Sequence, residues 1–470
     1  MHFLLILFVY FVSFLDKPEK TAPQLSERAW AQREKWNIET DQMDYPVSPM
    51  YMDSLRHMGI KIFHKSRWFN GVTCEMTKAQ ADKVKNLDFV TNVEMTRDNS
   101  SGSYWYAPWR AKRRVESEQA DSKLTDKQLK LFNLLPLHEA GFEGQGILLT
   151  VCDGGFYNAN TLSCFRHDEL ELGHFDFTDD SDGFYGYTGD HGTECLSTIS
   201  GIANNFYGAA TKAPYYLMRS EEVENNRESP KEMDNLVVAF ETADSLGVNI
   251  MSISLGYAEF DNDAWTLPKS ALDGKSTRSS LAATIAARKG MLVCVAAGNE
   301  GDSEWHTISS PADADSILTV GAVDTEGNIA YFSSYGPSAD GRVKPEVCAV
   351  GSGTTLINPY GYTITSSGTS FATPLIAGMA ACIWSALPDE NAMQIRERII
   401  RSANRRNHMI INNQYGYGIP DAWKAYTMQL GEDIPAVQED EDAPYKIIRG
   451  NQVLIIRHGH IYNLAGQRIE

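Results

Sequence analysis

The chain has 470 residues, of which 43% are hydrophobic and 22% charged, a composition typical of a folded globular protein of roughly two to four domains. Lysine and arginine number 42, and aspartate and glutamate number 61, so the net charge is −19. This negative charge argues against partners such as nucleic acid or an anionic membrane, which would repel it. Seven cysteines, none in a Cys-x-x-Cys pair, are too sparse for a disulfide-built scaffold or a zinc ribbon.

An apolar run occupies residues 3–15. It is too short to span a bilayer comfortably as a helix, and it has the length of the apolar core of a signal peptide. We therefore expect a signal peptide over residues 1–15, an exported protein, and no transmembrane segment in the mature chain. A buried N-terminal helix is the alternative interpretation of this run.

Residues 16–116 are expected to form a small α+β domain followed by a linker. Short apolar stretches at 60–63 and 89–93 indicate strands, and residues 77–84 indicate a helix with a threonine N-cap. Turn-forming residues at 99–103 then mark the start of the linker.

Residues 117–428 are expected to form a large α/β domain. Near-continuous apolar runs, typical of strands buried on both faces, alternate with helical segments such as 233–246 and 280–289. The pattern predicts one large parallel sheet flanked by helices. The runs lie at residues 147–152, 215–218, 250–253, 291–295 and 317–320. Residues 429–470 contain an acidic spacer and a short β-rich tail.

Four polar residues lie where a parallel sheet places functional groups, at the carboxyl ends of its strands. Asp153 and Asn299 follow predicted buried strands, while His191 and Ser370 lie at the starts of predicted helices. A serine hydroxyl needs an imidazole to take its proton, and the imidazole needs a carboxylate to orient it. Asn299 is well placed to donate a hydrogen bond to an oxyanion that develops during attack on a carbonyl.

The segments around these residues resemble the subtilisin-like serine peptidases, the subtilase family, which has the same chain order of Asp, His and Ser. Residues 368–374, Gly-Thr-Ser-Phe-Ala-Thr-Pro, match the family's serine motif. Residues 191–193, His-Gly-Thr, match the histidine motif, and residues 296–299, Ala-Ala-Gly-Asn, match the oxyanion motif. With supporting matches, the resemblance spans about residues 144–425.

The resemblance implies a subtilisin-like fold and hydrolysis of peptide bonds without a chemical cofactor or a catalytic metal. It implies that Asp153 orients the general base His191, that Ser370 is the nucleophile, and that Asn299 stabilises the oxyanion. It also implies contacts with the backbone of a polypeptide substrate, through Ser254, Leu255 and Gly256 as an added strand and Ala296, Ala297 and Gly298 along a specificity pocket. Cys195, one helical turn after His191, should lie beneath the imidazole.

The small N-terminal domain resembles the family's inhibitory propeptide through residues 66–72 and 87–90. This resemblance implies a zymogen, whose own propeptide blocks the cleft until the chain is cut between about residues 96 and 122. Two motifs depart from the family pattern. Gly154 replaces a threonine or serine after Asp153, and Leu196-Ser197 replaces Ala-Gly after the histidine motif.

Three alternatives bear on function. A non-catalytic subtilase scaffold that binds peptides competes with the enzyme, although all four chemical residues are present. The acidic segment 176–183 either binds a structural calcium ion or is a solvated turn, and the turn is favoured because the EF-hand spacing is absent. Glu221, Glu222 and Glu224 either favour basic substrate residues or are solvated surface.

Overall fold

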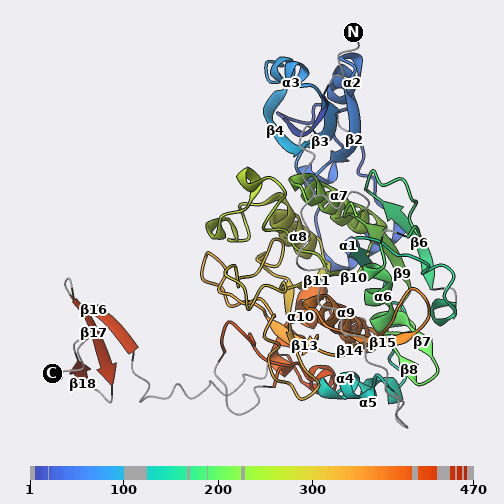
Figure 1. Cartoon of the computed structure of the whole chain (residues 1–470), viewed down its shortest axis with the longest axis vertical. Coiled ribbons are helices and arrows are strands. Elements are labelled where there is room, and N and C mark those ends of the chain that lie inside the picture. Colours follow the sequence, from blue (N-terminus) through green and yellow to red (C-terminus); the bar gives the residue numbers. More distant parts are fainter. Residues whose placement is uncertain are drawn as a thin grey trace. The chain divides into compact units, whose positions relative to one another are not determined.

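The computed structural model describes residues 6–19, 21–99, 124–166, 170–187, 189–223, 228–404 and 411–430, and three strands between residues 445 and 462. It divides into two compact units, Met1–Thr427 and Met428–Glu470 (Figure 1). The second unit is a three-stranded antiparallel sheet of β16 (Tyr445–Arg449), β17 (Gln452–Arg457) and β18 (His460–Tyr462). The predicted linker after residue 99 and most of the acidic spacer lie outside the described residues.

The first part of the larger unit is a small α+β domain, as predicted. Its antiparallel sheet has the strand order β2-β3-β1-β4. Two helices, α2 (Pro49–His57) and α3 (Lys78–Val84), share an apolar core with the sheet, and Thr77 caps α3 together with Gln80. The strands are β1 (Phe8–Phe14), β2 (Lys61–Ser66), β3 (Gly71–Met76) and β4 (Val90–Asp98), and a further helix, α1, spans Glu27–Trp36.

The signal peptide predicted over residues 1–15 is wrong for residues 8–14, which form the inner strand β1 of this sheet. Tyr10 and Val12 of β1 belong to the core shared with the helices. On the opposite face, Phe11 lies against the α/β domain, where the Arg278 guanidinium is 4.4 Å from its ring centroid. A strand buried on both faces is apolar without alternation, so it has the same composition as the core of a signal peptide.

The second part is an α/β domain built on a seven-stranded parallel sheet in the order β13-β12-β11-β10-β5-β9-β6. This confirms the predicted fold class. The five predicted strands are present, and the two others are a half-exposed strand, β6, and a short one, β13. The strands are β5 (Leu149–Asp153), β6 (Glu171–Asp176), β9 (Tyr215–Arg219), β10 (Ile250–Ile253), β11 (Leu292–Ala296), β12 (Leu318–Val323) and β13 (Val347–Val350).

Helices cover both faces of the parallel sheet. On one face lie α7 (Pro230–Leu246) and α8 (Arg278–Arg288), and on the other α6 (His191–Ser200) and α9 (Thr369–Ala386). Among the described helices, α9 has the length and hydropathy of a membrane span, yet 89% of it is buried, as befits a core helix. Smaller elements complete the domain: α4 (Asp126–Leu131), α5 (Leu135–Glu139), β7 (Ile202–Ala203), β8 (Phe206–Tyr207), β14 (Thr354–Ile357), β15 (Thr363–Ser366), α10 (Ala392–Ser402) and α11 (Ala422–Thr427).

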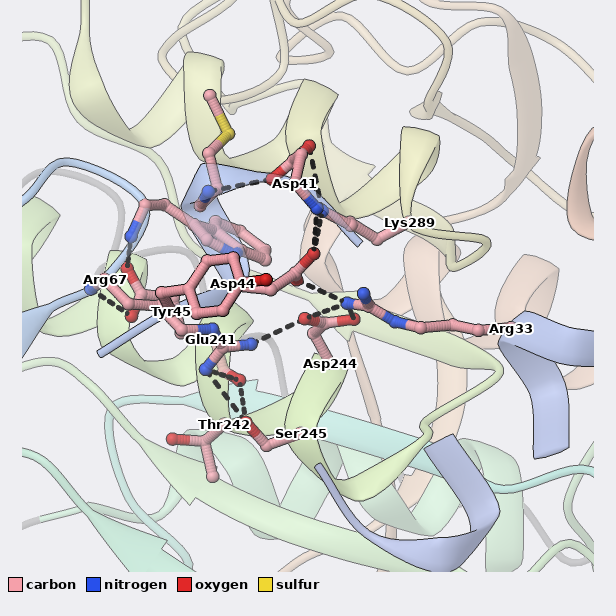
Figure 2. Close-up of polar contacts among 12 residues, drawn as sticks. Arg33, Asp41, Asp44, Tyr45, Arg67, Glu241, Thr242, Asp244, Ser245 and Lys289 are labelled. Carbon is pink, nitrogen blue, oxygen red and sulfur yellow. Dashed lines mark hydrogen bonds and ion pairs between the residues drawn. The ribbon is translucent and has the colours of Figure 1, made fainter. Parts of the chain in front are cut away.

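A network of buried ion pairs, which we call the charge clamp, joins the N-terminal domain to α7 and α8 (Figure 2). Arg33 of α1 contacts Asp44 of its own domain at 2.8 Å and Asp244 of α7 at 2.9 Å. Arg67 reaches the same Asp244 carboxylate at 2.5 Å, and Lys289 pairs with Asp44 at 2.8 Å. Burial raises the pKa of Asp44, but hydrogen bonds from Arg33 and Lys289 outweigh it and hold the pKa at about 2.

The turn between β2 and β3 packs against α7. The Glu241 carboxylate of α7 accepts hydrogen bonds from Ser66 Oγ at 2.6 Å and from the backbone N–H groups of Arg67 and Trp68 at 2.8 and 3.1 Å. The Trp68 side chain is 5% exposed and belongs to the same apolar core as α7 and α8. The two domains are therefore held together by an apolar contact as well as by charge.

Candidate active site

Asp153 and His191 form a hydrogen-bonded pair at the carboxyl edge of the sheet. Asp153 ends β5 and is fully buried, and its Oδ1 lies 2.8 Å from Nδ1 of His191, which begins α6. The Gly154 N–H donates to the same oxygen at 2.8 Å. Gly192 permits this close approach, because a Cβ there would lie 2.8 Å from the Cβ of Asp153. The Asp153 carboxylate accepts a hydrogen bond from Nδ1–H of His191, so Nε2 is the ring nitrogen that can accept a second proton.

Ser370 lies in the first turn of α9 and borders a cleft. Its Oγ donates to the Ser254 carbonyl at 3.4 Å, and Ser254 Oγ donates to the Ser370 carbonyl at 2.8 Å. Cys195 lies beneath the imidazole, as predicted, with its Sγ 3.9 Å from His191 Nδ1 and 3.4 Å from the Ser370 carbonyl. The thiol thus links the histidine helix to the serine helix. Burial raises its pKa to about 11, so Cys195 is neutral at ordinary pH.

Asn299 faces the same cleft from the loop after β11. Its Oδ1 accepts hydrogen bonds from the Thr369 N–H at 2.8 Å and from Thr369 Oγ1 at 3.0 Å. Because these bonds fix which end of the amide is the acceptor, Nδ2 is the group that can donate to a ligand. The Asn299 side chain is thus held against Thr369, the residue before Ser370, with Nδ2 as its remaining hydrogen-bond donor.

The cleft has a volume of about 790 Å³ and brings together most of the residues that the sequence predicts to contact substrate. It is lined by Ser254, Leu255, Gly256, Ala296, Gly298, Asn299 and Ser370. Ala297 is the exception, since it is fully buried in the core beneath α7 and α8 and does not line the cleft. The Ala297 side chain points into the protein interior, so a contact of this residue with substrate stays a prediction.

The unusual Gly154 makes room for an acidic side chain. A Cβ at this position would lie 3.0 Å from Glu221 Oε2 and 3.2 Å from Val223 Cγ1. The buried Asp153 Oδ2 accepts no hydrogen bond from the described residues, so nothing there replaces the hydroxyl that the family motif usually carries. Glu221 is 2% exposed and Glu222 is 8% exposed. The interpretation of these two glutamates as solvated surface is therefore wrong, and Glu224 lies outside the described residues.

The acidic segment 176–183 lies around a buried arginine. The Arg219 side chain, which is 1% exposed, pairs with Asp180, with Asp182 at 3.1 Å and with Asp176 at 3.8 Å. These contacts balance the negative charge of the segment with a guanidinium. They give three aspartates of the segment a partner other than the calcium ion that the sequence suggested.

The pKa of His191 sets an expected pH dependence. Burial disfavours the imidazolium, but the Asp153 carboxylate outweighs burial and holds the pKa of His191 well above its ordinary value. A general base must be neutral, so kcat/KM should rise with pH through a value above about 6.5. The measurement is a pH profile of kcat/KM on a neutral peptide. A profile already flat below about pH 6.5 would contradict this prediction.

Comparison with known proteins agrees with this geometry. Residues 144–418 match the model of the Subtilase family, peptidase S8, and residues 9–112 match the peptidase S8 propeptide domain of Bacteroidota. The first match covers more than half of the chain, so the chain belongs to the subtilase family. It is a serine-type endopeptidase made with an N-terminal propeptide. The propeptide match includes most of β1, in agreement with the correction above.

Individual relatives are similar at moderate identity. The thermostable alkaline protease of Halalkalibacterium halodurans is 25% identical over 369 residues, which are 78% of this chain and 86% of that protein. Subtilisin DY of Bacillus licheniformis is 30% identical over 267 residues, covering 56% of this chain and 85% of that protein. The crystal structure of MycP1 from the ESX-1 type VII secretion system has a TM-score of 0.52 and 21% identity. That alignment covers 68% of this chain and 91% of MycP1, and it shows a shared fold.

Proposed function

We propose that this protein is an exported endopeptidase that cleaves polypeptides through an acyl-enzyme on Ser370. His191 takes the proton of the Ser370 hydroxyl, Asp153 orients and balances the imidazolium, and Asn299 Nδ2 stabilises the oxyanion. The observation that carries the proposal is the hydrogen-bonded Asp153–His191 pair in contact, through Cys195, with the helix turn that bears Ser370.

The roles of the remaining residues follow from their places in the cleft. Ser254, Leu255 and Gly256 present backbone groups to an extended substrate, which adds to them as a strand. Ala296 and Gly298 line the pocket beside Ser370. We assign residues 117–428 to the catalytic domain, and we place the cut that releases the propeptide between residues 96 and 122. An attached inhibitor keeps the enzyme inactive during synthesis, which suits a protease that acts outside the cell that makes it.

A fluorophosphonate probe tests this proposal, because it reacts covalently with an activated serine. Wild-type protein should take up one probe, mapped to Ser370 by peptide mass, and should lose its propeptide. The matched control is Ser367→Ala, which removes a neighbouring hydroxyl that bonds only the Gly353 N–H among the described residues and should leave labelling intact. A chain that does not remove its own propeptide, and that stays unlabelled even after the linker is cut by limited proteolysis, would instead be a non-catalytic peptide-binding scaffold.

A further inference from the structure

The cleft is lined by an unusual number of acidic side chains. The α/β domain contributes six carboxylates to it, and no lysine or arginine is among the described residues that line it. The six are Glu221, Glu228, Glu259, Asp261, Asp263 and Glu300. A lining of one sign, within low-dielectric walls, concentrates ligands of the opposite sign.

Two of these carboxylates, Glu221 and Glu228, belong to a compact group of glutamates that also contains Glu222 and Glu232, and we call this group the acidic wall. The carboxylates of Glu221, Glu228 and Glu232 have oxygens within 4.8 Å of one another. Glu232 also accepts the Glu222 N–H at 2.8 Å, which ties the group together. Burial, and then the charges of the neighbouring glutamates, raise the pKa of Glu232 well above its ordinary value. Such crowding is relieved when a cation binds beside it.

The propeptide already places a cation against this wall. Arg97, near the end of β4, contacts Glu222 at 2.5 Å and Asp179 at 3.5 Å. The next residue, Asp98, lines the cleft. The segment that enters the cleft therefore brings a guanidinium to the wall, and removal of the propeptide takes that guanidinium away. Lys231, which also pairs with Glu222, belongs to α7 and stays behind.

The direction of the propeptide shows which side of the scissile bond faces the wall. Strand β4 runs into the cleft toward Asp98, and within the proposed range of residues 96–122 we place the cut after Asp98. Residues at the wall therefore precede the bond that is cut. Glu221 and Glu228 line the same cleft as Ser254, Leu255 and Gly256. The wall thus lies beside the part of the cleft proposed to bind extended substrate.

We infer that the acidic wall is a specificity subsite, in which Glu221 and Glu228 select an arginine or lysine side chain located two to four residues before the scissile bond. Gly154 contributes to this subsite, because a Cβ at residue 154 would lie 3.0 Å from Glu221 Oε2 and crowd that carboxylate. The inference rests on the proposed peptidase function and adds its substrate class. Charge-assisted hydrogen bonds to a guanidinium supply the recognition.

The test compares quenched peptides that carry arginine, citrulline or glutamate at each of these three positions, cleaved by the processed enzyme. Citrulline keeps the shape of arginine and removes its charge. We expect kcat/KM for the arginine peptide to exceed that for the citrulline peptide by about 10- to 100-fold at one position, and the ratio to fall at high salt. In the double variant Glu221→Gln, Glu228→Gln the ratio should approach one. The control, Glu326→Gln, removes an exposed carboxylate outside the cleft and should keep the wild-type ratio.

Each preparation is also labelled with the fluorophosphonate probe, which separates this inference from the proposed function. Labelled enzyme with equal kcat/KM for arginine and citrulline overturns the inference and leaves the peptidase intact. Absence of both labelling and cleavage overturns the two together. A third measurement adds calcium or EDTA. If the wild type, but not the double variant, gains thermal stability with calcium and shows no preference for arginine, the wall is a metal site and the inference fails.

Discussion

Replacing Ser370 with alanine is expected to leave the chain at full length and to lower kcat by about 10⁶-fold, the size of loss known for the corresponding serine of subtilisin. Without the hydroxyl there is no acyl-enzyme, and the remaining acceleration over water comes from substrate binding and from the Asn299 amide. The measurements are intact mass after incubation of purified protein and cleavage of a quenched peptide.

The Ser370→Ala variant should fold like the wild type. It loses only the 3.4 Å hydrogen bond from Ser370 Oγ to the Ser254 carbonyl, and it keeps the bonds that the residue 370 carbonyl accepts from Ser254 Oγ and Cys195 Sγ. Equal thermal stability of the full-length variant and full-length wild type would verify this. A variant that still removes its own propeptide at the wild-type rate in purified form would show that another group is the nucleophile.

The catalytic arrangement could be predicted from the sequence because each part of it is local. Asp153 ends a buried apolar strand, and His191 and Ser370 lie in the first turns of helices, so short motifs carry both the residue and its position in the fold. Parallel strands bring their carboxyl ends to one edge of the sheet, so residues far apart in sequence meet there. The motif identifies a segment and does not say which way each side chain points, so the burial of Ala297 could not be predicted from it.

Strand β1 shows why the N-terminal apolar run could not be assigned from the sequence. Its seven residues are apolar on both faces because one face packs on α2 and the other on the α/β domain. A run of this kind, at the start of a chain, satisfies the composition of a signal peptide and of a doubly buried strand equally well. Only the partners that bury its second face distinguish the two interpretations, and those partners lie far away in sequence.

The charge clamp has no local signal in the sequence, and the acidic wall has only a weak one, the glutamates at residues 221 and 222. Arg33 and Asp244 are 211 positions apart, and each is an ordinary charged residue on an amphipathic helix. Glu221 and Glu222 look like solvated surface, since charged residues are seldom buried. Their burial follows from Gly154, Lys231 and Arg97, which the fold brings to them. Long-range charge pairing is thus the part of the site that only the structure gives.

Replacing Asp244 with alanine is expected to lower the affinity of the released propeptide for the processed enzyme by at least about 100-fold. Asp244 balances both Arg33 and Arg67, and its side chain is only 4% exposed. Without this carboxylate, the Arg33 and Arg67 guanidinium groups stay in a buried interface with less negative charge to balance them. The binding free energy between propeptide and enzyme should therefore weaken by about 3–5 kcal/mol. The measurement is the concentration of released propeptide that halves the activity of the mature enzyme, together with the rate at which activity appears after processing.

The matched control is Glu397→Ala, which breaks an exposed pair with Arg401 within α10 and should change propeptide affinity by less than about 1 kcal/mol. The reciprocal variant Arg33→Ala should lower the affinity of the propeptide for the enzyme as well. Because Arg33 and Asp244 are in direct contact, the double variant should lose less binding free energy than the sum of the two single losses. Since Asp244 lies on α7 and does not line the cleft, kcat/KM of the mature enzyme should stay at the wild-type value. Wild-type inhibition in the Asp244→Ala variant would show that the apolar contact of Trp68, and not the charge clamp, holds the zymogen closed.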